Sequence, residues 1–98
     1  MYKIIDDRST GKSSRLMLLA KENNGIIVCA NPTALQKKAL NYGIVGIDFI
    51  SYEKYIYTEE YDTSKPIFID ELDGFLKAYD PAIQSYTLTE ERGAKWEK

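Results

Sequence analysis

Residues that could do chemistry occur in two short segments of this 98-residue sequence. The first is Gly11-Lys12-Ser13-Ser14, in which a glycine, a lysine and two hydroxyl side chains are consecutive. The second is Asp70-Glu71, two carboxylates that follow an apolar run. The sequence has no histidine and a single cysteine, so a four-ligand zinc site of Cys and His is excluded, as is an internal disulfide. Any metal must therefore be held by oxygen atoms.

The elements that position these segments follow from the pattern of apolar residues. Short β-branched runs alternate with helix-period stretches, which predicts an α/β fold with a three-layer, mostly parallel sheet. We expect strands at 2–5, 25–30, 44–50, 66–71 and 85–89, and helices at 12–23, 32–42, 52–56 and 72–79. The strands at 2–5 and 66–70 should be central and lie side by side, because a site shared by their carboxyl ends requires it.

The helix at 32–42 has a typical start, since Asn31 is a good N-cap and Pro32 a preferred first residue. Its inward-facing residues should be Leu35, Ala39 and Leu40. Residues 1–90 should form a single domain, with a charged, flexible tail at 91–98.

Composition narrows the classes of function and location. Thirteen Lys and Arg against 15 Asp and Glu give a net charge of −2. This balance argues against direct nucleic-acid binding, which needs a basic face. No apolar run approaches the ~20 residues that cross a bilayer, and acidic residues stand near the N-terminus where a signal peptide needs an apolar stretch. We therefore expect a cytoplasmic protein with no membrane contact, in which Cys29 is an inert buried thiol.

The segment Gly11-Lys12-Ser13, between a predicted strand and a predicted helix, resembles the second half of the Walker A motif of P-loop NTPases. In that motif backbone N–H groups and a lysine cradle phosphates at a helix N-terminus. The resemblance implies that four residues bind ATP: Gly11, Lys12, Ser13 and Ser14. The full motif has a glycine five residues before Gly11, where this sequence has Asp6, so a carboxylate stands near the expected phosphates. The alternative is a structural role, in which Ser9 or Thr10 caps the helix.

The segment from Ile67 to Glu71 resembles the Walker B motif and adjacent glutamate of the additional-strand, helicase-like P-loop class. The resemblance implies that Asp70 and Ser13 hold Mg²⁺ and that Glu71 polarises the attacking water. The alternative is that Asp70 caps the following helix. The resemblance covers residues 1 to about 90, with 85–89 at the place of a polar sensor strand, and is greatest to small ATPase-like proteins of bacteriophages.

A complete core of this class would need another strand, another helix and usually an arginine that stabilises the transferring phosphoryl group. The arginines here, Arg8, Arg15 and Arg92, have no recognisable finger context. We therefore expect a minimal P-loop core with weak or partner-dependent hydrolysis, the partner being another protein or a second copy of the chain. The alternative is an inactive, P-loop-derived binding or regulatory factor.

Four of the eight tyrosines are close together in the sequence: Tyr52, Tyr55, Tyr57 and Tyr61. They favour a protein contact surface over base stacking, because half-buried tyrosines are common at interfaces. Acidic residues at 59–62 disfavour nucleic acid and favour a basic protein partner.

Overall fold

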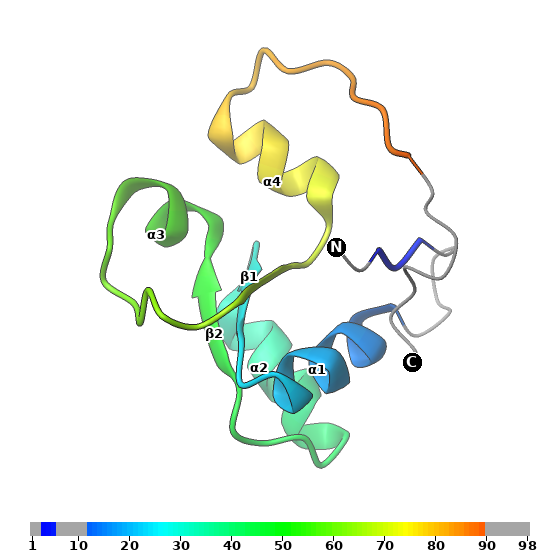
Figure 1. Ribbon diagram of the computed structural model, residues 1–98, viewed down its shortest axis with the longest axis vertical. Coiled ribbons are helices and arrows are strands. Elements are labelled where there is room, and N and C mark those ends of the chain that lie inside the picture. Colours follow the sequence, from blue (N-terminus) through cyan, green and yellow to red (C-terminus); the bar gives the residue numbers. More distant parts are fainter. Residues whose placement is uncertain (1–2, 6–11, 90–98) are drawn as a thin grey trace.

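The computed structural model describes residues 3–5 and 12–89, which contain four helices and three strands. In chain order these are α1 (Lys12–Glu22), β1 (Ile26–Cys29), α2 (Pro32–Asn41), β2 (Asp48–Ser51), α3 (Tyr52–Tyr57), β3 (Ile67–Ile69) and α4 (Leu72–Tyr79). The strands form one parallel sheet in the order β2-β1-β3. In Figure 1 helices α1 and α2 lie below β1, and α3 and α4 lie above it.

The middle strand, β1, is buried along its whole length. Ile27 is in register with Phe49 of β2 and with Phe68 of β3. A strand with a neighbour on each edge and helices on each face must be apolar at every position, as parallel strands usually are. This explains why 26–29 is an unbroken apolar run.

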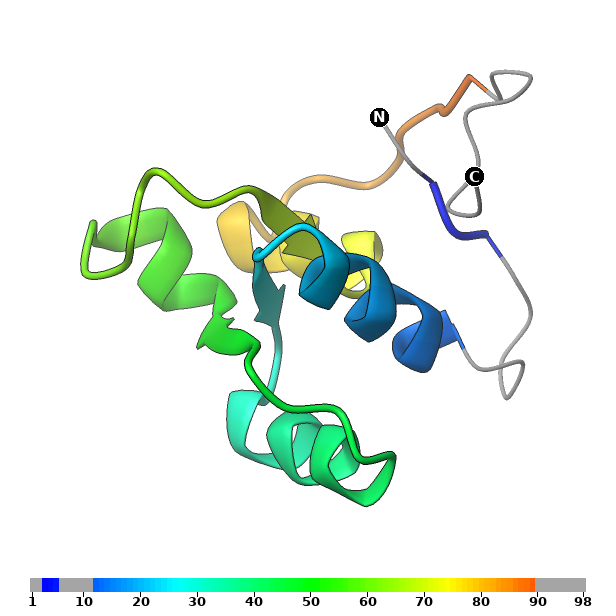
Figure 2. The same cartoon turned by 60° about the horizontal axis from the view of Figure 1, so that its bottom comes forward.

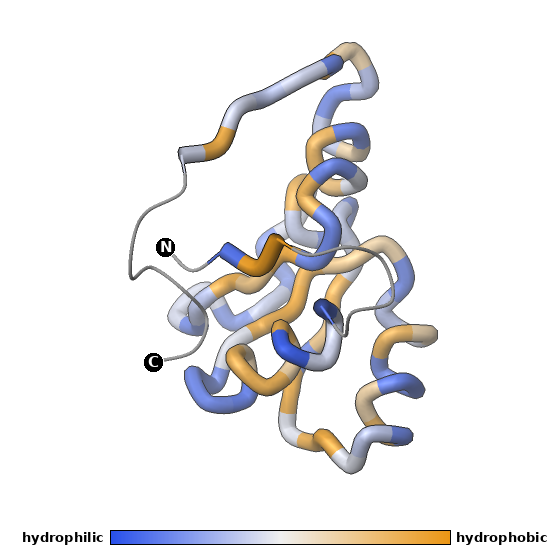
Figure 3. The backbone as a smooth tube through the Cα atoms, turned by 90° about the vertical axis from the view of Figure 1, so that its right-hand side faces the viewer, coloured by the Kyte–Doolittle hydropathy of each residue, from blue (hydrophilic) through white to orange (hydrophobic). Residues whose placement is uncertain are grey.

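The two faces of β1 contribute to two apolar clusters. Ile27 and Cys29 pack with Met17 of α1 and Ala39 of α2. The alternate residues, including Val28, belong to the second cluster, with partners from β2, α3, β3 and α4. Because successive side chains of a strand point to opposite faces, α1 and α2 cover one face and α3 and α4 the other (Figure 2). Figure 3 shows hydrophobic segments through the middle of the molecule.

The predictions of the four helices and of the strand at 25–30 are confirmed to within one residue at each end. Two helices begin at side-chain caps: Asn31 Oδ1 accepts from Ala34 N–H at 3.1 Å, and Ser51 Oγ accepts from Lys54 N–H at 3.0 Å. The expected inward face of α2 is correct at Ala39 and wrong at Leu40, whose side chain is 57% exposed.

The strand expected at 44–50 begins only at Asp48. Gly46 has a φ of +83°, a left-handed conformation that interrupts extended backbone. Ile44 and Ile47 are nevertheless buried, each 8% exposed, so the apolar run serves the core from a loop. Burial and strand geometry are separable here, and the apolar pattern indicated only burial.

The strands expected at 2–5 and 85–89 are wrong for the described residues, since 3–5 and 85–89 form no strand. Their apolar side chains lack a core to cover, because Ile5 is 65% exposed and Leu88 50% exposed. The expected pairing of 2–5 with 66–70 is wrong too. The strand at 66–71 is shorter than expected, and β3 lies at an edge of the described sheet beside β1.

Residues 3–5 and 85–89 instead meet each other. Lys3 Nζ donates a hydrogen bond to the carbonyl of Thr89, and Figures 1 and 2 show the chain after α4 running toward the same side of the molecule as residues 3–5. The tail expected at 91–98 lies outside the described residues.

Candidate functional site

The two segments singled out in the sequence meet at the carboxyl end of β3. Ser13 Oγ lies 3.4 Å from Asp70 Oδ1, although the two residues are 57 positions apart. Lys12 Nζ lies 3.5 Å from Glu71 Oε1. Asp70 is fixed to the sheet, because its backbone N–H donates to the Val28 carbonyl at 2.9 Å. The first turn of α1 and the residues after β3 therefore form one polar cluster.

The backbone turns sharply between β3 and α4. Glu71 has φ 60° and ψ 80°, a left-handed conformation that is unfavourable for a residue with a Cβ. It is the N-cap residue of α4, and its side chain makes no capping hydrogen bond. The capping role considered for Asp70 is therefore not observed. Both carboxylates are instead available to the start of α1.

The start of α1 is an electropositive position. No acidic residue occupies the first turn of α1, so the partial positive charge of the helix N-terminus adds to the ammonium of Lys12. Ser14 is partly buried on the same turn. Gly11, Asp6, Ser9 and Thr10 lie outside the described residues, so the expectations for them stay predictions.

Burial raises the pKa of Asp70 above its ordinary value, and the nearby Glu71 carboxylate raises it further. The hydrogen bond from Ser13 and the positive charges of Lys12 and Lys38 act in the opposite direction. Burial and like charge outweigh these contacts, so the Asp70 anion is incompletely compensated. A bound cation would relieve that cost.

Replacing Asp70 with Asn is expected to stabilise the fold at neutral pH and to have a smaller effect in acid. Because the folded-state pKa is raised above 3.8, the stability contributed by Asp70 is present below that pH and is lost as pH rises through the folded-state pKa. Urea unfolding of wild type and Asp70→Asn across this range measures the difference.

Asp62→Asn is the matched control with the opposite sign. Asp62 is exposed, and its hydrogen bonds with Ser64 lower its pKa. Its contribution to stability should therefore be present above 3.8 and lost as pH falls through its folded-state pKa. A difference between wild type and Asp70→Asn that does not change with pH would contradict the raised pKa of Asp70.

The oxygen atoms of Ser13 and Asp70 are of the type that binds Mg²⁺ in proteins. Within residues 3–5 and 12–89 no group of three or more His, Cys, Asp or Glu side chains could hold a metal. Mg²⁺ commonly uses one or two carboxylates together with substrate phosphates. Adjacent ligands in an octahedron of this size are about 2.9 Å apart. The two oxygens are 3.4 Å apart, which is wider than that separation, so they would have to approach each other to bind one ion.

The sequence analysis did not predict that Tyr52 belongs to this site. Its hydroxyl contacts the backbone of Asp70 and Glu71. Its side chain is 4% exposed, and its hydroxyl lies 2.6 Å from the Asp70 carbonyl and 3.1 Å from the Glu71 carbonyl. In the sequence, a tyrosine that follows an N-cap serine gives no sign of more than an ordinary packing role. The contact depends on how α3 and α4 meet, which no local signal carries.

The contact surface expected from the four tyrosines is only partly exposed. Tyr55 packs on Tyr61 and Phe75, with ring centroids 5.5 and 6.0 Å away. Of the four tyrosines expected at a contact surface, Tyr57 is the exposed one, at 69%.

The burial expected for Cys29 is confirmed, since its side chain is 1% exposed. Burial, with a smaller effect of Asp70, raises the pKa of the thiol to about 11. Cys29 is therefore protonated at neutral pH, which agrees with the inert role expected for it.

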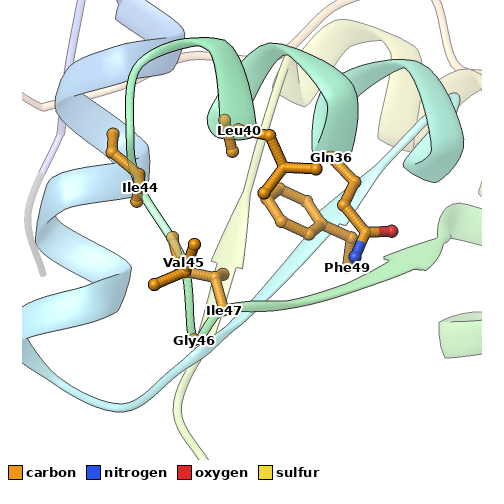
Figure 4. Close-up of a pocket in the computed structure, with 8 residues that line it drawn as sticks. Gln36, Leu40, Ile44, Val45, Gly46, Ile47 and Phe49 are labelled. Carbon is orange, nitrogen blue, oxygen red and sulfur yellow. The ribbon is translucent and has the colours of Figure 1, made fainter.

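A separate pocket lies beside α2, at the other end of the sheet (Figure 4). Its lining is mostly apolar: Gln36, Ala39, Leu40, Ile44, Val45, Gly46, Ile47 and Phe49. Several of these residues precede β2, whereas the polar cluster follows β3. Without a charged residue in its lining, this pocket suits an apolar side chain and not a phosphate.

No family model, curated protein or solved structure that was compared with the chain matches it. Within the described residues, every helix is too short or too polar to span a bilayer.

Proposed function

We propose that this chain is a P-loop nucleotide-binding module that binds ATP together with Mg²⁺, with weak or partner-dependent hydrolysis. The observation that most directly supports this proposal is the 3.4 Å distance between Ser13 Oγ and Asp70 Oδ1, two residues 57 positions apart in the sequence. In P-loop NTPases a serine or threonine hydroxyl and the Walker B aspartate hold the same Mg²⁺. The approach of these two residues, which come from separate motifs, supports the proposal.

The proposed roles follow from position and charge. Lys12, at the N-terminus of α1, attracts the phosphates, and Ser13 and Asp70 provide oxygen ligands for Mg²⁺. Glu71 lies beside Lys12 and is 58% exposed, so its carboxylate can be reached by water. Gly11 and Ser14 complete the phosphate loop in this proposal. The helices on both faces of the parallel sheet are compatible with a three-layer P-loop core.

The proposal extends to the setting in which the protein works. The resemblance to small phage ATPase-like proteins supports a phage or mobile-element origin. ATP and Mg²⁺ are cytoplasmic ligands, so the proposal keeps the cytoplasmic location expected from the sequence.

Thermal unfolding with Mg²⁺-ATP tests the proposal. A ligand that binds only the folded state stabilises it by about 2.7 kcal/mol at 100 times its Kd, so the unfolding temperature should rise with ATP concentration. The rise should be larger with Mg²⁺ than with EDTA. Ser13→Ala should remove the Mg²⁺-dependent part and keep the rest. An unfolding temperature that does not respond to ATP at any concentration up to millimolar would contradict nucleotide binding.

A second candidate function is a protein-binding or regulatory factor without catalysis. The observation that favours it is the group of exposed apolar side chains near the α2 pocket: Leu40, Tyr42 and Val45 are 57%, 53% and 57% exposed. Neighbouring exposed apolar residues are a common feature of protein contact surfaces. A chain that shows no ATP-dependent stabilisation would favour this candidate.

A further inference from the structure

Tyr52 is the first residue of α3, and it packs against α4. It follows Ser51, which ends β2 and caps α3. Its ring meets the Phe75 ring edge-on, with centroids 5.7 Å apart and planes at 75°. A Cβ at Gly74 would lie 3.0 Å from the hydroxyl, so the glycine allows α4 to approach it closely. The hydroxyl therefore has little freedom to move.

The hydroxyl makes its contacts with the backbone of the two carboxylate residues. Its proton is directed at the carbonyls of Asp70 and Glu71, with the shorter distance, 2.6 Å, to Asp70. The Glu71 carbonyl also accepts the Phe75 N–H at 3.1 Å, the first hydrogen bond of α4. Burial, with the nearby Asp70 charge, raises the pKa of Tyr52 to about 12, so the hydroxyl keeps its proton at neutral pH.

These hydrogen bonds are made at Glu71, whose backbone has an unfavourable conformation. Glu71 is held in the left-handed region at φ 60°, and such conformations persist where the surroundings fix them. The Tyr52 hydroxyl donates to the carbonyls of Asp70 and Glu71, which belong to the two peptide groups on either side of the Glu71 Cα. Without it, the backbone of Glu71 could relax toward an ordinary conformation and carry its carboxylate away from Lys12.

We infer that Tyr52 is a positioning residue that holds the backbone of Asp70 and Glu71 in the conformation that places their carboxylates against Ser13 and Lys12. The inference rests on the proposed function for its consequence, since the positioned groups are the proposed magnesium and water residues. In this inference the Tyr52 hydroxyl acts on the backbone of Asp70 and Glu71 and is not itself a ligand of nucleotide or metal. Tyr52 acts through its hydrogen bonds to two backbone carbonyls. Residues that surround a metal site commonly act in this way, by orienting the residues that bind the metal.

Tyr52→Phe tests this inference, because it removes the hydroxyl and keeps the ring. Mg²⁺ affinity in the presence of ATP, measured by calorimetry, should fall about 10-fold or more, the usual size of outer-group effects. ATP affinity in EDTA should not change, because Lys12 remains. The Cβ chemical shift and HN–Hα coupling of Glu71 should show loss of its positive φ.

Tyr55→Phe is the matched control, since it removes a hydroxyl from the same helix, and it should change neither measurement. Gly74→Ala is a second variant for the case that Tyr52→Phe does not fold. Its methyl group would press on the hydroxyl while alanine favours the helix, so it should weaken Mg²⁺ binding in a stable protein.

The outcomes separate the two proposals. A positive φ at Glu71 and unchanged Mg²⁺ affinity in Tyr52→Phe would overturn the positioning role. Wild type that binds no Mg²⁺-ATP, with a Glu71 conformation that still changes in Tyr52→Phe, would overturn the proposed function and uphold the positioning of the pair. A loss of Mg²⁺ affinity equal in Tyr52→Phe and Tyr55→Phe would count against Tyr52, because it would indicate general loosening of α3.

Discussion

Lys12→Ala is expected to remove between about half and most of the stabilisation that ATP confers. A hydrogen bond to a charged group contributes about 1.5–3 kcal/mol, so losing the lysine weakens binding by roughly ten- to a hundredfold. At an ATP concentration of 100 times the wild-type Kd, a hundredfold weaker variant retains only about 0.4 kcal/mol of the original 2.7 kcal/mol. Calorimetry and thermal unfolding with Mg²⁺-ATP both measure this loss.

The structure adds a reason to expect a large effect from Lys12. Its ammonium lies 3.5 Å from Glu71 and at the start of α1, so its loss would leave the carboxylates of Asp70 and Glu71 to repel an incoming phosphate. Lys37→Ala is the matched control, since it removes an exposed lysine from α2. Equal weakening by both variants would indicate a general effect of net charge. Unchanged binding in Lys12→Ala would contradict a phosphate loop at α1.

The sequence predicted best those elements whose signals are local. The cap at Asn31 predicts where α2 begins, and the structure confirms it. The apolar run at 25–30 predicted a strand, and β1 lies within it and is buried along its whole length. Each of these predictions depends on a few neighbouring residues and on no distant contact.

The strand predictions failed where a strand needs a partner that the pattern does not identify. Residues 85–89 alternate polar and apolar side chains, yet Tyr86 is 45% exposed and its hydroxyl bonds to Asp73. Alternation indicates a strand only when a core exists to receive one face. At 44–47 the apolar run does not form a strand, because Gly46 adopts a left-handed conformation.

The candidate site was predictable in part. The meeting of Lys12 and Ser13 with Asp70 and Glu71 was expected from the resemblance to P-loop motifs, and the structure brings these residues together. The contact from Tyr52 and the left-handed backbone of Glu71 were not predictable, because both arise from the packing of α4 against α3. Local sequence predicted the charged groups, and tertiary contacts determine how they are held.

Hydrolysis of ATP by the purified chain is expected to be indistinguishable from that of a Glu71→Gln variant. A missing arginine finger alone lowers the rate by about 10³–10⁵. Arg15 is the one arginine among the described residues, and the burial of its Nε and Nη2 atoms limits the donors that it can offer to a phosphate. Phosphate release from saturating Mg²⁺-ATP, followed over hours, measures the rate.

An arginine from outside the chain should raise that rate, and the increase should depend on Glu71. Guanidinium ion at millimolar concentration is a simple substitute for such a group, because it carries the same planar charge and donors. It should accelerate hydrolysis by wild type and leave Glu71→Gln unchanged, since a water that no carboxylate polarises gains less from charge on the phosphate. Fast, Glu71-dependent hydrolysis without guanidinium would contradict the expected need for a partner. Equal acceleration of both variants would remove Glu71 from the proposed mechanism and leave the chain as a nucleotide-binding module alone.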